Sequence, residues 1–208
     1  NSGDNLLTLG FLEGWYAHND LYPLRLRKSY AEAARFLGEV PRAVPVFYSM
    51  GNHERKCHFR EEWMKLVRES DVTWLDNEST LFRGVRIGGL SSMREGKADT
   101  GFLERLEGAG EYTLLMCHHP EMWRDYVQGR KIDFTVCGHA HGGQMQFFGR
   151  GLYSPGQGFF PKLTHGFYGN GTMLISRGMS NGTRLPRINN PCELIMLRLE
   201  PENQNEEE

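Results

Sequence analysis

The stretch "IDFTVCGHAHGGQ" (residues 132–144) joins an apolar run to a short loop that carries two histidines. The apolar run before Cys137 is typical of a buried strand. Glycine stands on both sides of the histidines, and it allows backbone conformations that other residues resist. His139 and His141 are two positions apart, so extended backbone would point both imidazoles to one side. The stretch therefore predicts a buried strand whose end presents two potential metal ligands.

Outward from this stretch, the sequence alternates between strand and helix patterns. Glycine-rich turns separate short apolar runs, and the first helical pattern is expected to stop at Gly38. This alternation of strands and helices predicts an α/β sandwich built on mixed sheets. The expected helices cover residues 24–38, 60–70 and 121–128, and the expected strands include 44–50, 111–120 and 132–137, with a hairpin over 79–92.

Composition narrows the class of protein. The chain has 208 residues, of which 39% are hydrophobic and 24% charged, with a net charge of −2. These values fit one globular domain and give no overall attraction for nucleic acid. The sequence has neither a long apolar run that would cross a membrane nor a visible signal peptide. Cys117 and Cys137 lie in apolar runs, as expected for buried reduced thiols.

Three more polar groups directly follow predicted strands. Asp4 lies in "SGDN", Asn52 and His53 lie in "GNHE", and His118 lies in "MCHHP". Loops at the carboxyl ends of strands are where such folds place their chemistry. Alternation along the strand favours His118 over His119 as a ligand, because His119 would face the other side.

Each group alone has a structural explanation, such as a turn for Asp4 or Asn52 and a capping or core role for His118. Together, however, four strand ends offer aspartate, asparagine and histidine, a set that suits a pair of divalent metal ions. Two adjacent ions activate a water molecule and stabilise both oxygens of an in-line displacement at phosphorus. The sequence therefore predicts hydrolysis of a phosphate ester, with His53 as a proton donor.

Four motifs, taken in order, resemble those of the calcineurin-like metallophosphoesterases: "GD" (3–4), "GNHE" (51–54), "CHHP" (117–120) and "GHAHGG" (138–143). The sequence that follows is similar to a bacterial branch that includes homologues of UDP-2,3-diacylglucosamine pyrophosphatase and membrane-anchored phosphoesterases. The resemblance covers residues 3–182, nearly the whole chain. It implies a four-layer α/β/β/α sandwich with two mixed β-sheets.

The resemblance also assigns roles to the candidate side chains. Asp4 would bridge two divalent ions, each of them manganese, iron, zinc, cobalt or nickel. His53 would be the catalytic histidine, and a metal-activated water would be the nucleophile. The second ion would be held by Asn52, His118 and His139, and the first ion by His141.

One part of the family pattern is absent, because no Asp-x-His motif precedes Asp4. We therefore expect the first strand to lie upstream of this chain and the first metal site to be impaired in this form. On this interpretation residues 1–200 are a single, N-terminally incomplete metallophosphoesterase domain, and residues 201–208 are an acidic disordered tail. The alternative is a non-catalytic metal-binding or interaction domain on the same scaffold.

The expected substrate is a small phosphorylated molecule, nucleotide- or lipid-linked, with a phosphomonoester, phosphodiester or pyrophosphate bond. The aromatic loop 154–171 would contact it or pack internally, and segment 13–30 would form a lid or a surface extension. Arg177 would neutralise a phosphate or join an ion pair, whereas His58 and His165 are expected to be exposed.

No nucleic-acid partner is expected, because the chain has no basic stripe. Membrane association is expected only through an upstream segment, so the predicted location is the cytoplasm or a membrane surface. The sequence gives no prediction of the oligomeric state.

Overall fold

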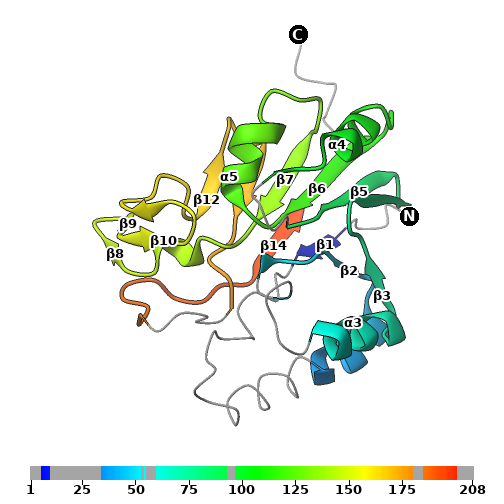
Figure 1. The fold of residues 1–208 in the computed structure, drawn as a ribbon, viewed down its shortest axis with the longest axis horizontal. Helices are drawn as coiled ribbons and strands as arrows, with labels where there is room; N and C mark the ends of the chain where they lie inside the picture. Colours follow the sequence, from blue (N-terminus) through cyan, green and yellow to red (C-terminus); the bar gives the residue numbers. More distant parts are fainter. Residues whose placement is uncertain are drawn as a thin grey trace.

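The computed structural model describes residues 6–9, 34–52, 54, 60–92, 97–179 and 185–200. Its largest unit is a six-stranded mixed sheet (Figure 1). The four central strands are parallel, and one antiparallel strand is added at each edge. The strands follow the order β12 (Gly166–Tyr168), β13 (Met173–Ile175), β7 (Phe134–Cys137), β6 (Tyr112–Cys117), β5 (Val85–Leu90) and β4 (Glu78–Phe82).

Helices cover one face of this sheet. They are α4 (Thr100–Glu107) and α5 (Pro120–Met122), and α5 continues into the π-helical turn η1 (Trp123–Val127). Phe102 and Leu106 of α4 are buried in one cluster with strand residues such as Leu115. Both faces of the central strands are therefore covered, which explains why β6 and β7 are apolar along nearly their whole length.

Two pairs of strands lie against the other face of the sheet. β2 (Val46–Tyr48) pairs in parallel with β3 (Val72–Trp74), and β1 (Leu6–Leu9) pairs antiparallel with β14 (Ile195–Arg198). Phe47 of β2 and Leu197 of β14 pack on a buried cluster that includes Leu114 of the six-stranded sheet. This apolar contact holds a second β layer against the first.

A last helical layer covers the outer side of β2 and β3 (Figure 1). It contains α3 (Arg60–Glu69) and a helix over residues 34–43. Leu37 and Trp63 are buried with Tyr48, whose hydroxyl accepts a 2.9 Å hydrogen bond from Trp63 Nε1. The order of layers is α/β/β/α around a mixed sheet, so the expected α/β class is confirmed.

Two local predictions were wrong or missing. The helix that was expected to stop at Gly38 continues to residue 43, because burial of Leu37 outweighs the roughly 1 kcal/mol preference of helices for alanine over glycine. Helix α4 was not predicted, although Asp99 caps it and accepts a hydrogen bond from the backbone N–H of Phe102. The signal was a capping residue followed by apolar residues at helical spacing.

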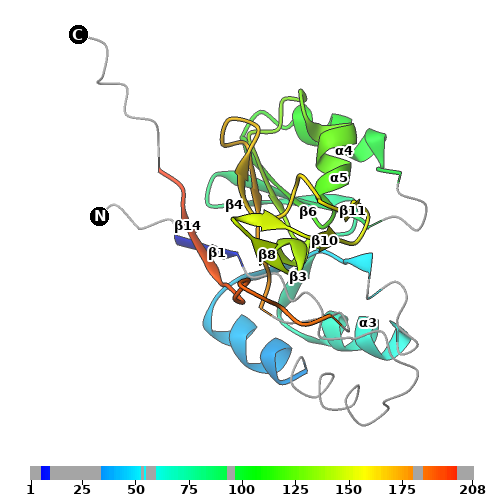
Figure 2. The same ribbon diagram turned by 90° about the vertical axis from the view of Figure 1, so that its left-hand side faces the viewer.

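Two short hairpins extend from the body beside these layers (Figures 1 and 2). β8 (Gln146–Phe147) pairs with β9 (Arg150–Gly151), and β10 (Tyr153–Ser154) pairs with β11 (Gly158–Phe159). Among the described residues, no helix has both the length and the apolar character that crossing a membrane requires.

The contact between the two β layers gives a first prediction, at Gly89 of β5. A Cβ atom at this position would lie 2.7 Å from Leu75 Cβ and would also collide with the Leu75 backbone. Gly89→Ala should lower the free energy of unfolding by roughly 1–3 kcal/mol, as measured by denaturant titration.

Gly38→Ala is the matched control, because nothing lies within 4 Å of the added methyl group. This change should raise the free energy of unfolding by about 0.5–1 kcal/mol, since the position is helical. Equal stabilities of the two variants would contradict the packing described for β5.

Candidate metal centre

Two histidine loops meet because the strands before them are parallel neighbours. β6 and β7 run in register, with Met116 opposite Val136, and both end at the same edge of the sheet. The backbone N–H of Gly138 then donates a 3.1 Å hydrogen bond to the carbonyl of His118. The loops that follow β6 and β7 are therefore tied together directly beyond the sheet.

Three imidazoles gather at this junction. Each of His118, His119 and His139 offers a ligand atom, and these atoms all lie within 4.8 Å of one another. Their ring centroids are 4.7 Å (His118–His119), 5.0 Å (His118–His139) and 4.0 Å (His119–His139) apart. Imidazole nitrogen suits zinc, iron, manganese, cobalt and nickel. Within the described part of the chain, this is the group of histidines that could hold a divalent cation.

Asn52 reaches the same junction from the second β layer. Its Oδ1 lies 2.8 Å from His118 Nε2, so two of the predicted ligand atoms face each other. Gly51 makes this approach possible, because a Cβ at that position would lie 2.8 Å from His118 Cε1. The "GN" turn after β2 therefore needs glycine for steric reasons, and the amide oxygen adds a neutral ligand to the imidazoles.

The orientation predicted for His119 was wrong. Strand β6 ends at Cys117, and Pro120 begins α5, so alternation no longer applies at His119. The ring turns into the cluster, where Nε2 lies 2.7 Å from Ser92 Oγ and Nδ1 lies 4.0 Å from Glu121 Oε2. The proline after the histidine pair was the sequence signal for this change of direction.

The loop after β7 also differs from its prediction. His139 and His141 have φ values of 64° and 49°, in the left-handed region, so the backbone is not extended as assumed. Such conformations are uncommon for residues other than glycine and are held by the surrounding structure. His141 is buried, but it does not belong to the three-histidine group. Its assignment to the first metal ion stays a prediction.

Other predicted site residues lie outside the described residues. They are Asp4, the expected bridging carboxylate, and His53, the expected catalytic histidine. The expected lid at 13–30 and the exposure of His58 lie there too. Their roles stay predictions.

Two polar residues near the aromatic loop have structural partners. The carboxylate of Glu193 lies 3.6 Å from Arg177 Nε and accepts a 2.7 Å hydrogen bond from the Arg177 backbone N–H, so the ion-pair alternative is the one observed. The exposure expected for His165 was wrong, because its half-buried ring lies 2.9 Å from Thr164 Oγ1. Desolvation by burial, and next the charge of Arg177, lower the pKa of His165.

Sequence comparison finds relatives that match part of their own length. Two proteins of Helicobacter pylori, from strains J99 and 26695, are called uncharacterized metallophosphoesterases; each is 28% identical, over 76% of this chain and 43% of the relative. The uncharacterized protein YpbG of Bacillus subtilis strain 168 is 27% identical, over 69% of this chain and 53% of its own length.

The chain thus spans about half the length of the curated relatives that it matches. No family model matches, and no solved structure matches. The names of the Helicobacter relatives support a metallophosphoesterase relationship, in agreement with the α/β fold and the histidine cluster.

A buried carboxyl beside the cluster gives a prediction for the metal-free protein. Glu54 Oε2 accepts a 2.9 Å hydrogen bond from the Gly51 backbone N–H, and burial raises the Glu54 pKa from 4.5 to about 7. The folded state therefore holds this proton more tightly than the unfolded chain does. This stabilisation is complete below the unfolded pKa and is lost as the pH rises through about 7.

Glu54→Gln should remove this pH dependence, because the uncharged amide still accepts the hydrogen bond from Gly51. Denaturant unfolding in the presence of a chelator, at about pH 5 and about pH 8, measures the effect. Between these pH values the wild type should lose up to about 3 kcal/mol more stability than the variant. Identical slopes would show that Glu54 is ionised in the fold.

Proposed function

We propose that this protein is a metal-dependent phosphoesterase. The observation that carries the proposal is the convergence of His118, His139 and Asn52 from three separate loops onto one buried junction. The relatives named metallophosphoesterases and the histidine cluster support the reaction class.

The residues fit a divalent ion on chemical grounds. The cluster combines imidazole nitrogens with the neutral amide oxygen of Asn52, which is a donor set for borderline metals. His118, His139 and Asn52 would hold the ion. A bound divalent ion lowers the pKa of a water molecule and withdraws charge from phosphoryl oxygens.

His119 takes a positioning role in this proposal. Both of its ring nitrogens face protein groups, Ser92 on one side and Glu121 on the other, while its ring packs 4.0 Å from that of His139. Ring contact of this kind fixes the orientation of a neighbouring ligand, as partners around metal ligands commonly do.

The finer parts of the proposal rest on the motif resemblance. They comprise a second ion held by Asp4 and His141, proton donation by His53, and a single catalytic domain over residues 1–200. The bond to be cleaved is a phosphomonoester, a phosphodiester or a pyrophosphate in a small substrate that is nucleotide- or lipid-linked.

His139→Ala tests the proposal. Loss of one ligand should lower manganese-dependent cleavage of bis(p-nitrophenyl) phosphate by more than about 100-fold, since weaker changes around metal ligands already cost 10- to 100-fold. The same change should weaken manganese binding measured by calorimetry.

His165→Ala is the control, because this half-buried histidine lies outside the cluster. It should keep most of the cleavage rate. A His139→Ala enzyme that is as active as the wild type would refute the proposed centre. Manganese binding without any cleavage in the wild type would point instead to a metal-binding domain that is not catalytic.

A further inference from the structure

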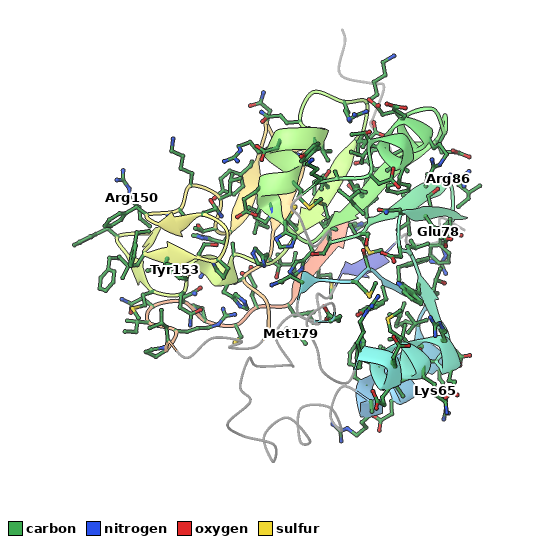
Figure 3. The ribbon with its side chains drawn as sticks, in the orientation of Figure 1. Lys65, Glu78, Arg86, Arg150, Tyr153 and Met179 are labelled. Atoms are coloured by element: carbon green, nitrogen blue, oxygen red, sulfur yellow. The ribbon has the colours of Figure 1, made fainter. Side chains whose placement is uncertain are left out.

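Residues 146–162 form a small unit, here called the phenylalanine lobe. β9 runs on into β10, and the backbone N–H of Phe160 donates a 2.9 Å hydrogen bond to the carbonyl of Leu152. The two hairpins, β8 with β9 and β10 with β11, thus follow each other directly and are joined through Leu152. Figure 3 shows the lobe at the side of the molecule opposite Lys65, with Arg150 at its outer end.

The lobe presents four aromatic side chains to solvent. Phe147 and Phe148 are 49% and 105% exposed, and Phe159 and Phe160 are 72% and 75% exposed. Single exposed apolar residues are common on proteins, but a group of large ones marks a surface that contacts something else. Phe159 packs edge-on against Tyr153, with ring centroids 5.5 Å apart, whereas Phe148 is fully exposed.

The backbone conformation at Phe148 and Phe160 is also unfavourable for phenylalanine. Phe148 and Phe160 have φ values of 52° and 53°, in the left-handed region. Phe148 and Gly149 are the two central residues of the β8–β9 turn, where asparagine and glycine are preferred. Fold stability therefore favours other residues at Phe148 and Phe160, which indicates that the exposed rings serve a contact outside the chain.

Along the sequence, the segment that contains the lobe carries charge of one sign, although in space Glu121 lies beside Gly156 and Glu193 pairs with Arg177. Between Asp133 and Glu193 the sequence has no acidic residue, and it has five arginines and lysines: Arg150, Lys162, Arg177, Arg184 and Arg187. This segment differs from the chain as a whole, whose net charge is −2. Arg150 and Lys162 are exposed and lie on the lobe itself. The partner of this surface should therefore be both apolar and negatively charged.

We infer that the phenylalanine lobe docks on membranes that contain anionic lipids. Exposed aromatic rings at a hairpin tip enter the apolar boundary of a bilayer, and neighbouring cations are attracted to anionic headgroups. Single-stranded nucleic acid fits less well, because its backbone requires a positively charged groove rather than two separate cations. The sequence analysis predicted membrane contact only through an upstream segment. The phenylalanine lobe would instead contact the membrane through described residues of this chain.

The lobe is also joined to the histidine loops. The backbone N–H of Leu152 donates a 3.0 Å hydrogen bond to the carbonyl of Gly143, which ends the short turn η2 (His141–Gly143). On the other side, a Cβ at Gly156 would lie 3.0 Å from Oε1 of Glu121, the neighbour of His119. Docking through the lobe would therefore bring the metal centre close to lipid headgroups.

Vesicle co-sedimentation of the 208-residue chain tests the inference without any assay of activity. The protein should bind vesicles of phosphatidylcholine with phosphatidylglycerol and should bind pure phosphatidylcholine vesicles more weakly. Phe148→Asn and Phe160→Asn should each weaken binding about tenfold. Both variants should keep or raise the melting temperature, because asparagine tolerates the left-handed backbone. Arg150→Gln and Lys162→Gln should each weaken binding about fivefold.

Two variants outside the lobe serve as controls. Leu81→Thr removes a half-exposed apolar side chain on β4, and Lys65→Gln removes an exposed cation on α3. Neither change should alter vesicle binding. The inference would be overturned by absent binding to the mixed vesicles, by equal binding to pure phosphatidylcholine, by equal losses in the controls, or by tighter binding to a single-stranded oligonucleotide.

Discussion

The hydrogen bond from the Gly138 N–H to the His118 carbonyl joins the two loops on which the site depends. It forms because β6 and β7 are parallel, in register and buried, so that their carboxyl ends stop side by side. The sheet thereby sets the distance between His118 and His139, and rotation of one side chain alone would not separate the loops. The chemistry of the junction follows from this alignment of strands.

The second β layer completes the junction. Asn52 follows β2 rather than a strand of the six-stranded sheet, and it reaches His118 only because Gly51 has no side chain. The contact between the two layers, where Gly89 lies against Leu75, is equally close. The packing of the two β layers and the assembly of the site therefore depend on the same feature. In both places glycine, Gly89 or Gly51, is needed because a side chain would collide with the neighbouring residue.

The electrostatics of the junction suit a cation. Three imidazoles and a neutral amide can share a buried space in the metal-free state because none of them must carry a charge. Two carboxyls of the described residues lie beside them, Glu54 and Glu121, and burial raises the pKa of both, which favours their neutral forms. A divalent ion would be the strongest charge in this environment.

Strong local patterns in the sequence were enough to predict much of this arrangement. The apolar runs before His118 and His139 form strands, and the α/β class follows from their alternation with helices. Asn52 and His118, both predicted as metal ligands, lie 2.8 Å apart at Oδ1 and Nε2, and their ligation of a metal stays a prediction. The resemblance added the order of the motifs and the roles of the residues. The positions of Asp4 and His53 are not tested, because both lie outside the described residues.

The wrong predictions have physical causes, and except for Pro120 after the histidine pair the local sequence pattern gives no sign of them. His119 turns inward because β6 ends at Cys117, three residues before the expected end of the strand, and Pro120 begins a helix. His139 and His141 adopt left-handed backbone that surrounding contacts impose. The helix passes through Gly38 because Leu37 is buried by a partner distant in sequence. The aromatic loop 154–171 was expected to contact substrate or to pack internally, but Phe159, Phe160 and Phe167 are mostly exposed, so internal packing is not what the structure shows for them.

The most direct measurement of the central claim is anomalous diffraction from crystals grown with manganese. The account predicts an anomalous peak bonded to His118, His139 and Asn52, at distances of about 2.0–2.3 Å from their ligand atoms. A fully loaded crystal whose only peaks lie away from these three side chains would contradict it.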